Sequence, residues 1–181
     1  MKQTAVALAA LLLIAGACNR KPETAANLNA ANKVAMRMVR LYYESAQMQL
    51  AAETRNVALP ESAAGAIPMV VRELLKGPVM PASLRLFPTD TVVRGAYVLP
   101  GGTVIVDLGG ATLTQGWGTG SHQELMAVYS LVQTVTANFP AEAKSVRILL
   151  NGTPAETLGG HVSLSKSLLP PRAELIEPRS R

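Results

Sequence analysis

Apolar and polar side chains alternate in five stretches of the chain, and this period of two predicts β-strands there. In the first stretch Val39, Leu41 and Tyr43 share one face, so Tyr42 is expected on the opposite face. Residues 100–102, Pro-Gly-Gly, separate two neighbouring stretches and predict a hairpin turn. The strands are expected at residues 38–43, 49–58, 91–99, 103–108 and 144–150.

Two other stretches have the period of an α-helix. The first lies within residues 62–76, where apolar side chains form a stripe along one side. Pro68 suits the first turn of this helix, and Gly77 followed by Pro78 ends it. The stripe consists of Val70, Val71, Leu74 and Leu75.

The second helix is expected over residues 121–138. Ser121 and Glu124 have the spacing of a capping box, in which the serine hydroxyl accepts from the glutamate amide and the glutamate side chain reaches back. Residues 111–120 before it are rich in Gly and Thr and predict a long loop. The inward-facing side chains of this helix are Leu125, Val128, Leu131, Val132 and Val135.

The element order is therefore β-β-α-β-β-α-β, which predicts an α+β fold. We expect a two-layer sandwich with the helices on one face of a small mixed sheet. The predicted organisation is a signal peptide over residues 1–17, a flexible tether over 18–36, the domain over 37–166 and a loose tail, rich in Pro and Arg, over 167–181.

The N-terminus has the pattern of a bacterial export signal. Residues 5–14 are ten apolar residues without a charge, fewer than the roughly 20 that span a bilayer. Ala15, Gly16 and Ala17 then precede Cys18, an order that resembles a lipobox in which Ala15 replaces the usual leucine. The resemblance implies cleavage before Cys18 and a lipid anchor on its thiol. The alternative is an ordinary cleaved signal with an incidental cysteine.

Composition excludes several other classes of function. The formal net charge is +5, but the basic residues are scattered and not interleaved with aromatics, so no nucleic-acid partner is expected. Cys18 is the single cysteine, which rules out an internal disulfide and argues against a cysteine-based zinc site. The paired glycines at 101–102 and 109–110 lack the spacing of a phosphate loop, so no cofactor is expected.

Short motifs follow one another over most of residues 38–165. They are Tyr42-Tyr43, residues 73–78 (ELLKGP), Phe87-Pro88, residues 104–108 (VIVDL), 118–121 (GTGS), 130–134 (SLVQT), 146–152 (VRILLNG) and 157–161 (TLGGH). Their order resembles the GerM-type domain of the sporulation and spore germination family, although Asn151 stands where an acidic residue is more typical. The resemblance implies a non-enzymatic envelope module of lipoproteins and of proteins linked to spore or cell-wall processes. It supplies no catalytic residues.

The residues that could perform chemistry are few. His122 and His161 lack ligand-type neighbours at helical spacing, so no metal site is expected. Ser121, His161 and Asp107 would form a triad only if the fold brought them together, and no Gly-x-Ser-x-Gly elbow is present. A capping Ser121 and an Asp107 that binds loop amides are the simpler structural roles.

Two aromatic residues are candidates for a binding surface. Trp117, the single tryptophan, lies between glycines in the predicted loop, where it would serve as an exposed platform for a sugar ring or a protein, or would fold back onto the core. Tyr42, opposite the inward face of its strand, would be exposed or covered by the tail.

These observations predict a binding module held in the bacterial cell envelope by a lipid on Cys18, facing the periplasm or the cell exterior. Its expected partner is an envelope protein, another copy of itself in a homo-oligomer, or peptidoglycan. The alternative is a cell-wall hydrolase or an activator of one, which would need a cluster of polar side chains in a cleft.

Overall fold

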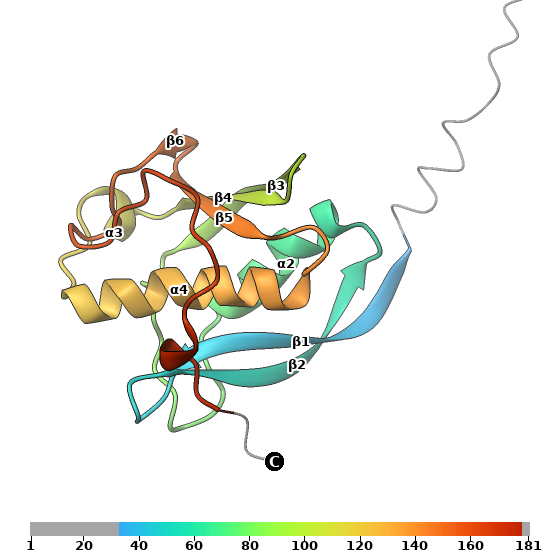
Figure 1. The fold of residues 1–181 in the computed structure, drawn as a ribbon, viewed down its shortest axis with the longest axis horizontal. Coiled ribbons are helices and arrows are strands. Elements are labelled where there is room, and N and C mark those ends of the chain that lie inside the picture. Colours follow the sequence, from blue (N-terminus) through green and yellow to red (C-terminus); the bar gives the residue numbers. More distant parts are fainter. Residues whose placement is uncertain (1–32, 179–181) are drawn as a thin grey trace, which may run out of the picture.

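The structure is a computed structural model that describes residues 33–178. The predicted signal peptide, Cys18 and most of the predicted tether lie outside the described residues. Within the described part, the chain forms two sheets with helices between them (Figure 1). No helix among residues 33–178 is both long enough and apolar enough to cross a bilayer.

The first sheet is an antiparallel hairpin of β1 (Val34–Glu44) and β2 (Leu50–Pro60). Leu41 lies opposite Glu53 in its register. Both strands are longer than the sequence pattern predicts. Residues 34–36, expected to belong to the tether, are part of β1 because they pair with residues 58–60 of β2. Backbone pairing therefore extends the strand beyond the point where side-chain alternation indicates it.

The second sheet has the order β3 (Val92–Leu99), β4 (Thr103–Gly109), β5 (Ser145–Leu150) and β6 (Thr153–Pro154). β3 and β4 form the predicted hairpin, and β4 runs parallel to β5. At the turn into β6, Asn151 and Gly152 have positive φ angles of 50° and 77°. Asn-Gly is the sequence that such a turn favours. The sheet is therefore mixed, as predicted.

Two long helices, α2 (Ala63–Leu75) and α4 (Ser121–Asn138), lie between the sheets. α2 packs against both hairpin strands and β3, and α4 lies along β1 and contacts β5. The predicted α+β class and element order are confirmed. The structure adds that β1 and β2 form a sheet of their own, on the far side of the helices from β3–β6 (Figure 1).

Polar side chains of α4 close the free edge of β1. Asn138 accepts from the Arg40 amide and donates to the Arg40 carbonyl, at 3.0 and 2.7 Å. Thr134 accepts from the Tyr42 amide at 3.1 Å, and Ser130 donates to the Tyr42 carbonyl. Because residues four apart share one side of a helix, this row replaces the missing neighbouring strand. It leaves β2 as the open edge of the hairpin.

The boundaries of α2 differ from the prediction at one end. The helix starts at Ala63, so Pro68 lies in its interior and not in the first turn. The other end is as predicted, because Gly77 follows the helix with φ 89°, a conformation that glycine adopts without strain. Residues 111–114, expected to be part of a loop, form the short helix α3 (Ala111–Thr114).

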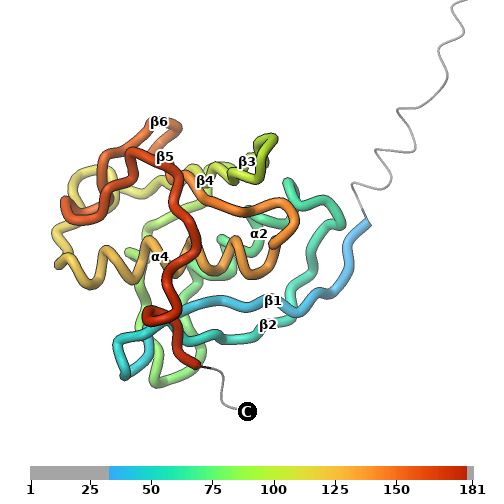
Figure 2. Tube along the Cα trace, viewed as in Figure 1, coloured from blue at the N-terminus to red at the C-terminus, as the bar shows by residue number. Residues whose placement is uncertain are grey.

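The C-terminal segment is packed and not loose. Leu168 bridges to Val146 of β5, a 3₁₀ turn η1 (Ala173–Leu175) follows, and Ile176 lies parallel to Leu50 of β2. Figure 2 shows this segment crossing α4 on its way to the hairpin. Backbone hydrogen bonds to two separate sheets hold it, and its Pro-rich composition alone does not indicate them.

Candidate functional site

The outer face of the β1–β2 hairpin exposes an apolar strip. Tyr43 on the inner face donates its hydroxyl to the Leu74 carbonyl of α2, so even-numbered residues of β1 point away from the helix. Val34, Met36 and Met38 lie on this outer face with 58%, 67% and 73% of their surface exposed. Scattered apolar residues are common on surfaces, but three successive ones on one strand face form a continuous strip.

The strip continues into a groove of about 730 Å³. Arg40 and Tyr42 of β1 and Thr54 of β2 belong to the same face and line the groove. Its other walls are the loop around Met80 and the C-terminal residues 176–178. We call the strip and the groove together the outer hairpin surface. It consists of Val34, Met36, Met38, Arg40, Tyr42, Ala52, Thr54, Met80 and residues 176–178.

The two aromatic candidates are both buried. Tyr42 is 5% exposed, at the bottom of the groove that the C-terminal segment borders. Trp117 is 9% exposed and stacks on Phe87 with ring centroids 6.4 Å apart. Trp117 therefore folds back onto the core and is not an exposed platform, because stacking on Phe87 removes its apolar ring from water. A role for either ring in binding stays a prediction.

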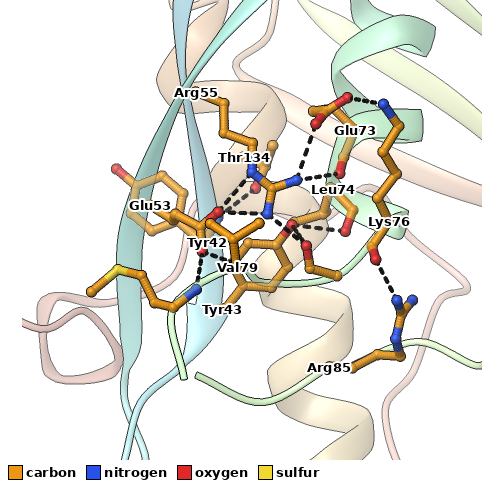
Figure 3. A network of polar contacts seen from close by, with 12 residues as sticks. Tyr42, Tyr43, Glu53, Arg55, Glu73, Leu74, Lys76, Val79, Arg85 and Thr134 are labelled. Carbon is orange, nitrogen blue, oxygen red and sulfur yellow. Dashed lines mark hydrogen bonds and ion pairs between the residues drawn. The ribbon is translucent and has the colours of Figure 1, made fainter. Parts of the chain in front are cut away.

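Beneath the groove, a buried ion-pair network centres on Arg55 (Figure 3). Its guanidinium lies between Glu53 and Glu73, with Nη2 2.5 Å from a Glu53 oxygen and Nη1 3.0 Å from a Glu73 oxygen. Nη2 also donates to the Gly77 carbonyl at 2.6 Å. The other Glu53 oxygen accepts from the amides of Val79 and Met80 at 2.9 and 3.2 Å. The network therefore positions the loop that carries Met80 to the groove.

The same network satisfies the carbonyl end of α2. Tyr43 donates to the carbonyls of Leu74 and Gly77, and Arg85 donates to those of Leu75 and Lys76. Cations near this end also interact favourably with the helix dipole. Burial raises the pKa of the Tyr43 hydroxyl, although the Arg55 charge opposes that shift. The donors that this helix end lacks thus come from β1, β2 and the following loop.

Charges within the network shift the pKa values of its members. Burial by itself raises the pKa of Glu73, but hydrogen bonds from Lys76 and Arg55 outweigh it, so the net shift is downward. Burial likewise disfavours a charged Arg55, yet its hydrogen bonds to Glu53 and Glu73 hold the pKa of Arg55 above its usual value. Both shifts favour the charged forms of Glu73 and Arg55.

Glu124 does not form the predicted capping box. Its side chain is fully buried, and its two oxygens accept from the amides of Leu158 and His161 at 2.9 and 2.8 Å. Ser121 makes no side-chain cap bond, and Gly120 occupies the N-cap position. Gly159 lies so close that a Cβ there would be 2.8 Å from the Trp117 carbonyl. Glu124 therefore holds residues 158–161 against the loop before α4.

The pKa of Glu124 is lowered. Burial raises it, but hydrogen bonds from the backbone amides of Gly159, His161, Val162 and Leu158 together outweigh the burial. A carboxylate that accepts several amides is stabilised in its ionised form. The motifs at 118–121 and 157–161 also meet here, because His161 Nε2 lies 3.0 Å from the Thr119 carbonyl.

The histidines and Asp107 have structural partners. His122 Nε2 lies 2.6 Å from a Glu44 oxygen, and His161 Nε2 lies 3.0 Å from the Thr119 carbonyl. Asp107 accepts from the Gly152 amide at 2.7 Å, which is the loop-binding role expected for it. No hydrogen bond joins any two of Ser121, His161 and Asp107, all of which the structure describes. Among residues 33–178, no group of three acidic, His or Cys side chains is arranged to hold a metal ion.

Sequence reasoning missed the Arg55 network, although a signal for it exists. Glu53 and Arg55 lie on the same face of β2 as the buried Leu59, and the residues between them point outward. Opposite charges two apart on an inward face indicate a buried pair. The third member, Glu73, comes from a helix and could be identified only from the fold.

Comparisons with known proteins agree with this architecture. The model of one family, Germane, described as sporulation and spore germination, matches residues 40–156. A search of curated proteins finds no match. Among solved structures, a Clostridium perfringens chain described as a lipoprotein is similar at 18% identity and a TM-score of 0.53, covering 74% of this chain and 87% of that one.

Two further solved structures come from the sporulation protein GerM of Bacillus subtilis. Its first GerMN domain is 19% identical with a TM-score of 0.51, covering 74% of this chain and 97% of that one. Its tandem GerMN domains are 19% identical with a TM-score of 0.52, covering 75% of this chain and 46% of that one. At these identities the likeness shows the fold.

Proposed function

Because this chain belongs to the Germane family of sporulation and spore germination domains, we propose that it is a lipid-anchored envelope protein whose domain binds an extended segment of a protein partner. The partner strand adds to the open edge of β2 and covers the outer hairpin surface. The observation that carries this proposal is the apolar strip of Val34, Met36 and Met38 beside the groove.

The open edge of β2 supports a strand-adding partner. The Leu50 carbonyl points outward and accepts from the Glu177 amide, so the alternate residues 52, 54, 56 and 58 also present their backbone groups outward. In the part of the chain that the structure describes, β2 pairs along its length with β1 alone, and Ile176 occupies only its start. An extended peptide binds such an edge through main-chain hydrogen bonds and gains specificity from side-chain pockets.

The side chains of this surface suit a protein partner. Methionine side chains are flexible and polarisable, so they adapt to different apolar contacts. The acidic, basic and histidine side chains described above are engaged with backbone amides, carbonyls or one another, which supports binding over bond-breaking chemistry. Envelope location and the lipid on Cys18 are part of this proposal and rest on the pattern of the N-terminal sequence.

The test uses an edge-blocking substitution, Thr54→Pro, with Thr54→Val as its matched control. The Thr54 amide points away from β1, so proline removes a donor from the open edge without breaking the β1–β2 ladder. A photo-crosslinking residue at Asn56 is expected to give adducts with an envelope protein in cells, which mass spectrometry identifies. Thr54→Pro should abolish these adducts, and Thr54→Val should keep them.

Three outcomes would contradict the proposed partner. Adducts that persist unchanged in Thr54→Pro would show that the edge is not used. Adducts solely with other copies of the chain would replace the partner with self-association. Loss of turbidity when the purified protein is incubated with isolated peptidoglycan would indicate a hydrolase in place of a binding module.

A second substitution tests the anchor. Cys18→Ser is expected to move the protein from the membrane fraction to the soluble or secreted fraction, because a thioether-linked lipid needs the thiol. Fractionation followed by immunoblotting measures the change. If Cys18→Ser leaves the protein in the membrane fraction and metabolic labelling with a fatty acid detects no lipid on the unaltered chain, the anchor assignment is wrong.

A further inference from the structure

A second groove, on another part of the surface, is lined by cations. It has a volume of about 530 Å³ and lies between the end of α2 and the start of β3. Arg72 and Lys76 come from the end of α2, and Arg85 comes from the loop that follows it. Thr89, Thr91, Leu75, Val92 and Val93 complete the lining, and none of these described residues is acidic.

The charges around this groove leave an excess of positive charge. Lys76 is 3 residues from Glu73 and pairs with it at 2.5 Å, but Glu73 also pairs with Arg55. Arg85 is held by the carbonyls of Leu75 and Lys76, which fixes its charge beside the groove. The carbonyl end of α2 adds about half a negative charge, less than one of these cations supplies. The carboxylate of Asp90, next to Thr89 and Thr91, is turned to the Thr112 amide of α3.

Thr91 gives an independent indication of a ligand. It is 7% exposed, and its hydroxyl is the one buried side-chain oxygen or nitrogen in the described residues that has no hydrogen-bond partner. A buried hydroxyl without a partner costs free energy, so such groups are rare unless a ligand or water satisfies them. The hydroxyl is buried in the structure, but Thr91 lines the groove, so the hydroxyl would reach a ligand there by rotation about the Cα–Cβ bond to another staggered position.

We propose that this groove binds a phosphate group, with Arg72, Lys76 and Arg85 as counter-charges and the Thr89 and Thr91 hydroxyls as neutral donors. A phosphate offers several acceptor oxygens and up to two negative charges, which match several cations and two hydroxyls better than one carboxylate does. The phosphate would belong to a lipid headgroup or to a soluble phosphate anion. The proposal stands independently of strand addition at β2.

The experiment titrates inorganic phosphate into isotopically labelled full-length chain carrying Cys18→Ser and follows amide chemical shifts by NMR. Saturable shifts are expected at residues 89–93 and 76–77. Arg72→Gln and Lys76→Gln are each expected to weaken binding roughly three- to tenfold, the loss typical of one charge-assisted contact. Lys166→Gln is the matched control, because Lys166 is an exposed cation that does not line the groove.

Thr91→Val separates the site from general charge attraction. Valine has the same shape without the hydroxyl, so the thermal midpoint should stay equal or rise while phosphate binding weakens. Shifts that do not saturate, or that Lys166→Gln reduces as much as Arg72→Gln does, would overturn the proposal. Sedimentation with phosphatidylglycerol vesicles then identifies the source of the phosphate, with phosphatidylcholine vesicles as the control. Pelleting that depends on Arg72 indicates a lipid headgroup. Saturable phosphate shifts without such pelleting indicate a soluble anion.

Discussion

Replacing Arg55 with methionine is expected to destabilise the domain by about 3–5 kcal/mol, because it leaves the carboxylate of Glu53 buried without its counter-charge. Glu53 is 5% exposed, and methionine retains the apolar stem of Arg55 while removing the guanidinium. The carbonyls of Glu73 and Gly77 lose a donor in the same step. Urea denaturation followed by circular dichroism measures the change in the free energy of unfolding.

A double-mutant cycle shows whether the pair causes the effect. Glu53→Gln removes the opposite charge, so the Glu53→Gln, Arg55→Met double variant should be less destabilised than the sum of the single variants by about 1–3 kcal/mol. Arg55→Lys keeps the charge but cannot bond Glu53, Glu73 and Gly77 together, so an intermediate loss is expected. Additive losses in the cycle would contradict a coupled ion pair.

The Arg55 network also connects stability to the proposed surface. Glu53 binds the amides of Val79 and Met80, and Met80 lines the groove on the outer hairpin surface. A variant that breaks the network therefore changes both the fold and one wall of the groove. For this reason the strand-addition test substitutes Thr54, whose side chain lies on the opposite face of β2 from Glu53 and Arg55.

Replacing Glu124 with alanine is expected to cost about 2–4 kcal/mol, because the buried amides of Leu158 and His161 lose a charged acceptor. Glu124→Gln keeps the shape but offers only one acceptor oxygen to two donors, so a smaller loss is expected. Urea denaturation measures both. Ser121→Ala is the matched control at the start of the same helix, and a change within about 0.5 kcal/mol is expected since Ser121 makes no cap bond.

The lowered pKa of Glu124 also predicts a pH dependence. Folding favours the ionised form of Glu124. Its contribution to the free energy of unfolding is therefore complete above the ordinary glutamate pKa of 4.5, and it is lost as the pH falls through the lower pKa of the folded state. The unaltered chain should therefore lose stability below about pH 4.5, and Glu124→Gln should lose less over the same range. Equal acid sensitivity of the two chains, or a Ser121→Ala loss as large as that of Glu124→Ala, would contradict the role assigned to Glu124.

Local patterns in the sequence predict most of the secondary structure. Alternation, helical period and turn residues place the strands β1 to β5, the hairpin of β3 and β4, and the helices α2 and α4, because these signals depend on side chains close together in the chain. Asn151-Gly152 predicts its turn for the same reason, since it supplies positive φ angles at little cost. The errors at Pro68 and residues 34–36 concern where an element begins, which depends on backbone pairing as much as on side chains. The short helix α3 is missed altogether, because its Thr-rich sequence resembles a loop.

The sequence by itself determined the α+β class, the element order, the family resemblance and the expectation of an anchored binding module. Only the tertiary structure decided the partners of the charged residues. Glu124 has the spacing of a capping residue, yet its carboxylate binds amides more than 30 positions away, and Arg55 joins a strand to a helix. Long-range contacts of this kind depend on how elements pack, and spacing along the chain carries no record of that packing. The same reason explains why Trp117 is buried and why the exposed strip lies on β1.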